Sequence, residues 1–292
     1  MLMHADLGPR GQGAHVPATT QWRPSRTYEF AGGDVAYEVL GDGSPVVLIH
    51  GTPSWSYLWR NVASDLAAQH TVYVYDLLGY GISEQREHQD VSIAAQTKVL
   101  AELLDLWGLE APCVAGHDFG GTIAVRLLLL EGKRFRRLAL CDPVAIAPWI
   151  TPFSRHVQAH LEAFQTMPGH IHRQMIATHI RTAIMREMTD DQLEPYLRPW
   201  LGTAGQAAYY RQVAQFDERY TREIEPRYGK IQTPTLLLWG AHDGWLDPHF
   251  GQRLARMIPG ARLSLIPGAG HFLPEDQPKT VAAELGAFFG EE

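Results

Sequence analysis

One aspartate stands where a short turn can present a nucleophilic side chain. Asp118 is the central residue of the segment Gly116–Gly120 (GHDFG), which follows an apolar, strand-like run and precedes a helical one. Glycines beside the centre permit a tight strand-to-helix turn in which a Cβ would clash, and the same spacing surrounds nucleophilic serines. Such a turn exposes the central side chain at the carboxyl end of a sheet. It also directs the next backbone N–H, that of Phe119, towards a developing negative charge. A close-packed junction without chemistry is the structural alternative.

A histidine and two further aspartates also follow strand-like runs. His271 lies in a loop of small residues after the last run, and Asp243 follows the preceding run; this position distinguishes His271 among the 14 histidines. A histidine oriented by a carboxylate can act as a general base. Asp142, at the end of another run, is a possible alternative acid, although Pro143 follows it and the pair also fits a hinge. We favour Asp243.

Eight β-rich runs alternate with helical patterns and would position these residues. The first two are joined by a turn signal and predict an antiparallel hairpin, whereas the others are continuous apolar runs typical of strands buried on both faces of a parallel sheet. The expected strands are Thr27–Phe30, Val35–Leu40, Val46–His50, Val72–Asp76, Pro112–Gly116, Arg137–Cys141, Thr235–Trp239 and Arg262–Ile266. The alternation predicts an α/β fold with a mostly parallel eight-stranded sheet and helices on both faces.

The 292 residues fit one domain that carries an insertion. Residues 145–229 contain helical patterns broken by prolines and glycines but no buried-strand pattern, which predicts an inserted helical cap. The core is then formed by residues 27–144 and 230–292. Residues 1–26 are rich in Gly, Pro and Arg and predict a flexible N-terminal tail.

Composition excludes several classes of partner. The net charge of −7 leaves no basic surplus for binding phosphates, so no nucleic-acid partner is expected. No apolar run approaches the roughly 20 residues that span a bilayer, and the N-terminus lacks the apolar stretch of a signal peptide. We therefore expect a soluble, cytoplasmic monomer or homodimer that acts on a small molecule without a membrane partner. No spacing typical of metal ligands is present and the glycine loops lack a phosphate-binding lysine, so neither a metal nor another cofactor is expected.

Three segments together resemble one family. His50–Arg60 (HGTPSWSYLWR), Asp76–Ser83 (DLLGYGIS) and the turn around Asp118 are similar to the α/β-hydrolase superfamily, in the branch with an aspartate nucleophile. That branch contains haloalkane dehalogenases and epoxide hydrolases, and the first segment is closest to the dehalogenases. The resemblance implies Asp118 as nucleophile, His271 as base and Asp243 as its acid partner. It also implies an oxyanion hole formed by the N–H groups of Thr52 and Phe119.

An aspartate nucleophile narrows the range of substrates that the protein could act on. A carboxylate near its reference pKa is already ionised at neutral pH, so the first step needs no base. Attack on an ester carbonyl would create a reactive anhydride, whereas attack on a saturated carbon creates an ordinary ester. Histidine can then activate water against that ester. The expected electrophile is therefore a carbon–halogen bond or, as the alternative, an epoxide.

The group that stabilises the leaving group is ambiguous in the sequence. Dehalogenases usually carry a tryptophan directly after the nucleophile, and its indole N–H donates to the halide. The residue at that position here is Phe119, whose side chain has no hydrogen-bond donor. Trp55, Trp149 and Trp245 are candidate replacements, and Tyr210 resembles one of the two cap tyrosines of epoxide hydrolases. Because neither donor set is complete, two further alternatives stay open: a hydrolase of another substrate such as a lactone, and a small-molecule binding protein that has lost its chemistry.

Overall fold

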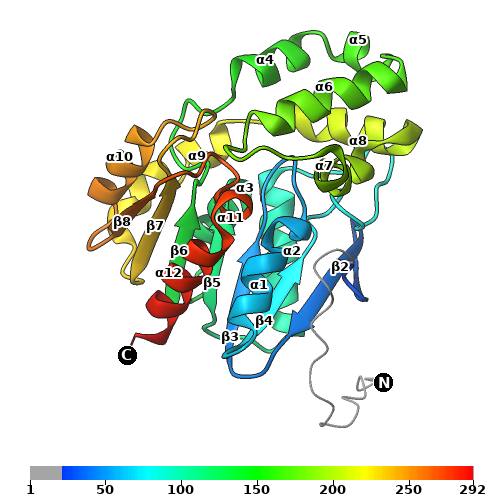
Figure 1. The fold of residues 1–292 in the computed structure, drawn as a ribbon. Helices are drawn as coiled ribbons and strands as arrows, with labels where there is room; N and C mark the ends of the chain where they lie inside the picture. The colour runs from blue at the N-terminus through cyan, green and yellow to red at the C-terminus, as the bar shows by residue number, and fades with distance from the viewer. Residues whose placement is uncertain (1–21, 292) are drawn as a thin grey trace, which may run out of the picture.

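The computed structural model describes residues 22–291 and contains a single eight-stranded sheet, as predicted (Figure 1). Its strands lie in the order β1-β2-β4-β3-β5-β6-β7-β8, and only the pairs β1–β2 and β2–β4 are antiparallel. The strands are β1 (Arg26–Phe30), β2 (Gly33–Leu40), β3 (Ser44–Ile49), β4 (His70–Tyr75), β5 (Cys113–His117), β6 (Arg137–Cys141), β7 (Thr235–Gly240) and β8 (Arg262–Ile266). Each expected strand is present, with bounds that differ by two residues or fewer.

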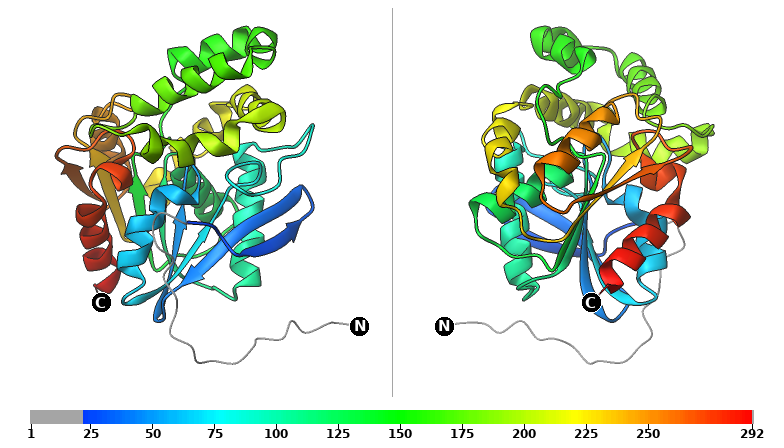
Figure 2. Two further views of the ribbon diagram at one scale, coloured as in Figure 1. Left: turned by 45° about the vertical axis from the view of Figure 1, so that its right-hand side comes forward. Right: turned by 90° about the vertical axis from the view of Figure 1, so that its left-hand side faces the viewer.

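The central strands form the core because both of their faces are covered. All residues of β5, β6 and β7 are buried, as their continuous apolar sequences predict. Helices α1 (Arg60–Leu66) and α12 (Pro278–Gly290) pack together on one face of the sheet, and α2 (Ile93–Leu106) and α3 (Phe119–Leu130) on the other (Figure 2). Two further core helices, α10 (His249–Met257) and α11 (Leu273–Asp276), flank β8 in the sequence.

The register aligns the carboxyl ends of the parallel strands. Ile49 pairs with Gly116, and His117 pairs with Cys141. The loops that follow β3, β5 and β6 therefore begin side by side at one edge of the sheet. This edge is where ligands bind in open α/β sheets.

Helices between β6 and β7 lie over that edge (Figure 1). They are α4 (Pro152–Ala159), α5 (Leu161–Gln165), α6 (Gly169–Arg181), α7 (Asp190–Leu197), α8 (Gly202–Ala214) and α9 (Arg219–Arg222). On this basis we propose the same domain division as from the sequence. Residues 27–144 and 230–292 form the core, and residues 145–229, called the cap below, form the insertion.

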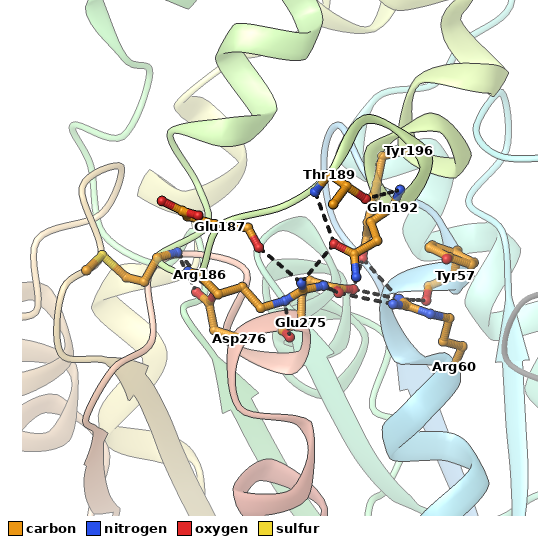
Figure 3. A network of polar contacts seen from close by, with 10 residues as sticks. Tyr57, Arg60, Arg186, Glu187, Thr189, Gln192, Tyr196, Glu275 and Asp276 are labelled. Carbon is orange, nitrogen blue, oxygen red and sulfur yellow. Dashed lines mark hydrogen bonds and ion pairs between the residues drawn. The ribbon is translucent and has the colours of Figure 1, made fainter.

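A buried ion cluster ties the cap to the core (Figure 3). The guanidinium of Arg60 donates two hydrogen bonds to the Glu275 carboxylate, at 2.6 and 3.0 Å. From the cap, the Tyr196 hydroxyl donates to the same carboxylate at 2.5 Å, and Arg186 pairs with it. Burial alone would raise the pKa of Glu275, but its donors, Arg60 foremost, hold that pKa below its ordinary value.

The N-terminal segment differs in part from the predicted tail. Residues 1–21 lie outside the described residues. Trp22, however, is buried, and its indole N–H donates to the Ser56 hydroxyl at 3.0 Å. Arg26 is already the first residue of β1. The end of the segment is therefore part of the fold, because one aromatic side chain in it finds a pocket that local composition does not reveal.

Candidate active site

Asp118 occupies a strained turn between β5 and α3. Its φ of 52° lies in the left-handed region, which a non-glycine residue adopts only when its surroundings enforce it. Its N–H donates to the Cys141 carbonyl at 3.1 Å and its own carbonyl accepts from Val144 at 3.2 Å, so the next strand holds the turn. A Cβ on Gly120 would lie 2.3 Å from the Ile49 carbonyl oxygen, which explains the glycine in the motif.

The structure brings the three predicted triad residues together. The two atoms His271 Nδ1 and Asp243 Oδ2 are 2.9 Å apart, and His271 Nε2 is 3.4 Å from Asp118 Oδ2. Burial would lower the pKa of His271, but the charges and hydrogen bonds of Asp243 and Asp118 outweigh it and raise that pKa well above its usual value. The imidazole can thus exchange a proton next to the Asp118 carboxylate.

Asp142, the alternative acid, lies behind this pair. It is fully buried, its Oδ1 accepts from the Gly240 N–H at 2.8 Å, and its other oxygen has no hydrogen-bond partner among residues 22–291. Burial, and then the negative charge of Asp243, raise the pKa of Asp142 well above its usual value. A carboxyl held neutral in this way is poorly suited to stabilise an imidazolium, whereas Asp243 makes the direct contact with His271.

One half of the predicted oxyanion hole touches the nucleophile. The Thr52 N–H donates to Asp118 Oδ1 at 2.8 Å. The preceding His50 is buried, which lowers its pKa to about 3, and its neutral ring bridges the Gly51 carbonyl and the Leu77 N–H, at 2.9 and 2.8 Å. This bridge fixes the loop that carries Thr52.

The second predicted donor of the oxyanion hole, the Phe119 N–H, does not make the corresponding contact. Within the described part of the chain, no hydrogen bond joins the Phe119 N–H to the Asp118 carboxylate. The Phe119 ring instead packs edge-on against Trp149 and Phe216, with ring centroids 5.4 and 5.0 Å apart. Its backbone role in an oxyanion hole stays a prediction.

A cavity lies between the sheet edge and the cap. Asp118 and His271 are at its floor, and most of its walls are apolar or aromatic. The lining comprises Thr52, Pro53, Asp118, Phe119, Val144, Trp149, Ile150, Thr151, Ser154, His179, Tyr209, Gln212, Val213, Phe216, Trp245, Leu246 and His271. A cavity with this lining suits a small apolar molecule.

The tryptophans predicted to stabilise a leaving group have their indole N–H groups engaged elsewhere. Trp149 and Trp245 line the cavity, but Trp55 does not. The acceptors are the Pro195 carbonyl for Trp55 at 3.0 Å, the Thr221 hydroxyl for Trp149 at 3.1 Å and the Thr182 hydroxyl for Trp245 at 2.9 Å. Among residues 22–291, each of these three candidate indoles therefore already has an acceptor for its N–H.

Tyr210 is also engaged outside the cavity. His172 Nε2 lies 2.9 Å from the Trp200 carbonyl and must donate to it. Burial lowers the pKa of His172, so the ring is neutral and its Nδ1 accepts the Tyr210 O–H at 2.9 Å. The neighbouring Tyr209, not Tyr210, lines the cavity.

Sequence reasoning missed Gln212. This residue is buried on α8 and lines the cavity beside Tyr209 and Val213. Those three positions have the i, i+3, i+4 spacing of one helix face, and a polar residue on such a face was the available signal. The Gln212 carbonyl oxygen accepts from the Thr52 hydroxyl at 2.6 Å.

A group of possible metal ligands also departs from the sequence expectation. His117, Asp142 and His271 each offer one ligand atom, and these atoms lie within 4.8 Å of one another. However, His117 Nε2 already contacts the His271 carbonyl oxygen at 2.9 Å, and burial lowers the pKa of His117 to about 4. We interpret the group as the surroundings of the base.

No helix in the described part of the chain is both long and apolar enough to cross a membrane.

Comparisons with known proteins agree with this geometry. Residues 44–278 match the family model described as alpha/beta hydrolase fold. Haloalkane dehalogenase 2 of Mycobacterium tuberculosis is 27% identical to this chain. The matched region covers 91% of this chain and 95% of that protein. A cis-3-alkyl-4-alkyloxetan-2-one decarboxylase of Shewanella oneidensis is 26% identical, over 89% of this chain and 86% of that protein. A crystal structure of an alpha/beta hydrolase fold protein from Burkholderia ambifaria superimposes with a TM-score of 0.88 at 40% identity, over 90% of this chain and 97% of that one. With a family model that spans most of its length and relatives that match it nearly end to end, the chain belongs to the α/β-hydrolase fold family, and it is similar to a haloalkane dehalogenase over most of its length.

Proposed function

We propose that this hydrolase cleaves a carbon–halogen bond in a small apolar molecule through a covalent ester on Asp118. One observation carries the proposal: the two carboxylate oxygens of Asp118 have different neighbours. Oδ1 accepts the Thr52 N–H at 2.8 Å, while Oδ2 lies 3.4 Å from the His271 imidazole and is free to attack. The apolar cavity above it supports a substrate without charge.

The reaction has two steps. Asp118 Oδ2 forms a bond to the carbon, and the carbon–halogen bond breaks with its electron pair leaving on the halide. His271 then takes a proton from water, whose oxygen attacks the ester carbon of Asp118, and the Thr52 N–H stabilises the negative charge on Oδ1. Collapse returns the carboxylate and releases an alcohol, so that water and the halide compound give alcohol, halide and a proton.

The environment of His271 suits this order. In the free enzyme, Asp118 and Asp243 both raise the pKa of His271. Ester formation removes the charge of Asp118, so one cause of the raised pKa disappears when the imidazole must accept a proton. Ester formation therefore lowers the pKa of His271, so that the imidazole can give up its proton and act as the base in the second step.

Trapping the ester tests the proposal. In the His271→Gln variant, n-butyl bromide should release one equivalent of bromide and leave a butyl group on the peptide that contains Asp118, as seen by mass spectrometry. His249→Gln, a substitution of an exposed histidine, is the matched control and should turn over normally. In a single turnover of the unmodified protein in heavy-oxygen water, label should enter Asp118 before the product. Continued bromide release without an adduct, or label that appears first in the alcohol, would refute the covalent route.

Epoxide opening is the second candidate, and Tyr209 is the observation that favours it. Its side chain lines the cavity, and burial raises the pKa of its hydroxyl, which stays protonated and able to donate. A diol formed from styrene oxide, with a loss of that activity in Tyr209→Phe and no halide release from alkyl bromides, would replace the first proposal with this one. Tight binding of these compounds that survives in Asp118→Ala without turnover would instead indicate a binding protein.

A further inference from the structure

Besides the His271 imidazole, the cavity lining has a second buried nitrogen without a hydrogen-bond partner among residues 22–291, and it belongs to Gln212. Gln212 is 2% exposed, and its Nε2 has no hydrogen-bond partner among residues 22–291. An amide nitrogen carries two N–H donors, and a buried donor without a partner destabilises the folded state. Such a group is expected where a ligand completes it.

Two hydroxyl groups fix the orientation of this amide. Gln212 Oε1 accepts from the Thr52 hydroxyl at 2.6 Å and from the Tyr80 hydroxyl at 2.7 Å. Burial raises the pKa of Tyr80, so its hydroxyl keeps the proton that it donates. With both hydroxyls on the oxygen, the nitrogen end of the amide is the end left without a partner.

Thr52 joins this amide to the nucleophile. Its N–H donates to Asp118 Oδ1 and its hydroxyl donates to Gln212 Oε1, so the amide is two hydrogen bonds from the attacking carboxylate. Phe119 and Val213 line the same cavity and give it apolar walls. A donor in an apolar pocket is worth more to a developing anion than the same donor in water.

We propose that the Gln212 side-chain amide holds the halide that leaves when Asp118 forms its ester. This inference rests on the proposed function and supplies the donor that the engaged tryptophans do not. As the carbon–halogen bond breaks, its electron pair moves to the halide, and Gln212 donates hydrogen bonds through Nε2 without transferring a proton. An amide N–H is too weak an acid to protonate an alkoxide, so this donor suits a halide and not an epoxide oxygen.

Bromide itself is a probe that needs no turnover. In proton–nitrogen correlation spectra, the side-chain amide signals of Gln212, identified by their loss in Gln212→Met, should shift when sodium bromide is added. Gln206 lies on the same helix, and its Nε2 donates to the Met167 carbonyl at 2.8 Å, so its signals should stay fixed. The absence of a shift at Gln212, or an equal shift at Gln206, would overturn the proposal.

Kinetics separate this inference from the proposed function. In the His271→Gln background, Gln212→Met should slow ester formation from n-butyl chloride about 100-fold, as expected for the loss of one donor to a developing anion. The effect should be smaller for n-butyl iodide, because iodide is the better leaving group and needs less help. Gln206→Met is the control and should leave both rates unchanged.

Equal rates with and without Gln212→Met would overturn the inference while the ester mechanism stands. If no ester forms in either protein, the proposed function fails, and the bromide titration then decides the role of Gln212 by itself.

Discussion

Replacing Asp243 with asparagine should stop the reaction after its first step. Asp243 Oδ1 accepts the N–H groups of Trp245 and Leu246, at 2.8 and 2.9 Å. The asparagine oxygen must occupy that place, because only an acceptor can meet two donors. Its NH₂ group then faces His271 Nδ1, which is 2.9 Å from the present Asp243 Oδ2. The imidazole is forced to accept at Nδ1 and to carry its proton on Nε2, where it cannot take a proton from water.

The size of the effect follows from that change of tautomer. The same substitution in the serine-protease triad lowers kcat about 10⁴-fold, which corresponds to about 5.5 kcal/mol of barrier. Ester formation on Asp118 needs no base, so it should proceed. Rapid mixing of Asp243→Asn with excess n-butyl bromide should therefore give a burst of one bromide per protein, followed by turnover about 10⁴-fold slower than normal.

The matched control is Asp142→Asn. Burial and the charge of Asp243 raise the pKa of Asp142 well above its usual value and so favour its neutral form, and the asparagine oxygen can keep the hydrogen bond from Gly240. We expect turnover within about threefold of normal, since a neutral group replaces a neutral group of the same shape. The assignment of the acid is refuted if Asp142→Asn stalls after the burst while Asp243→Asn keeps turning over.

Three further predictions concern stability. Glu275→Leu should lower the free energy of unfolding by about 3–5 kcal/mol in urea titrations, because it leaves the buried Arg60 guanidinium without its carboxylate partner. Lys279→Ala is the control: it removes a solvent-exposed ion pair and should lower that free energy by less than about 1 kcal/mol. Equal losses in the two variants would contradict the buried cluster. Gly120→Ala should yield little folded protein by circular dichroism, because its Cβ meets backbone at 2.3 Å, while Gly229→Ala, with open space around it, should fold normally. The raised pKa of His271 means that its charged form stabilises the folded state; this contribution is complete below about pH 6.5 and is lost as the pH rises through the folded pKa. The stability advantage of the wild-type protein over His271→Gln should accordingly shrink as the pH rises above about 6.5, and an advantage that grows with pH would contradict the sign of this argument.

The fold and the proximity of the three candidate triad residues could be predicted from the sequence because each depends on local patterns. Continuous apolar runs marked the strands, and the register then brought the residues just after them to one edge. Asp118, Asp243 and His271 were found because each follows such a strand. Asp142 was harder, since it follows a strand too, and only its burial and contacts distinguish it from Asp243.

The leaving-group donors could not be predicted because hydrogen bonds between distant segments decide them. The indole of Trp149 is engaged by Thr221, which is 72 residues away in the sequence. The amide of Gln212 is oriented by Thr52, 160 residues away. No local spacing reports which of several donors is already satisfied in the folded chain.

The loop that carries the base is continuous with the cap through backbone hydrogen bonds. The Phe272 N–H donates to the Ala183 carbonyl at 2.8 Å, and Asp276 accepts N–H groups from Gly270 at 2.8 Å and from Arg186 at 3.0 Å. Lifting the cap would therefore displace the imidazole. Trp149 and Trp245 border both the cavity and an open surface groove beside it. A substitution at Trp149 would alter this border without touching the base, whereas one at Trp245 would also remove the ring that stacks on His271, with ring centroids 5.0 Å apart.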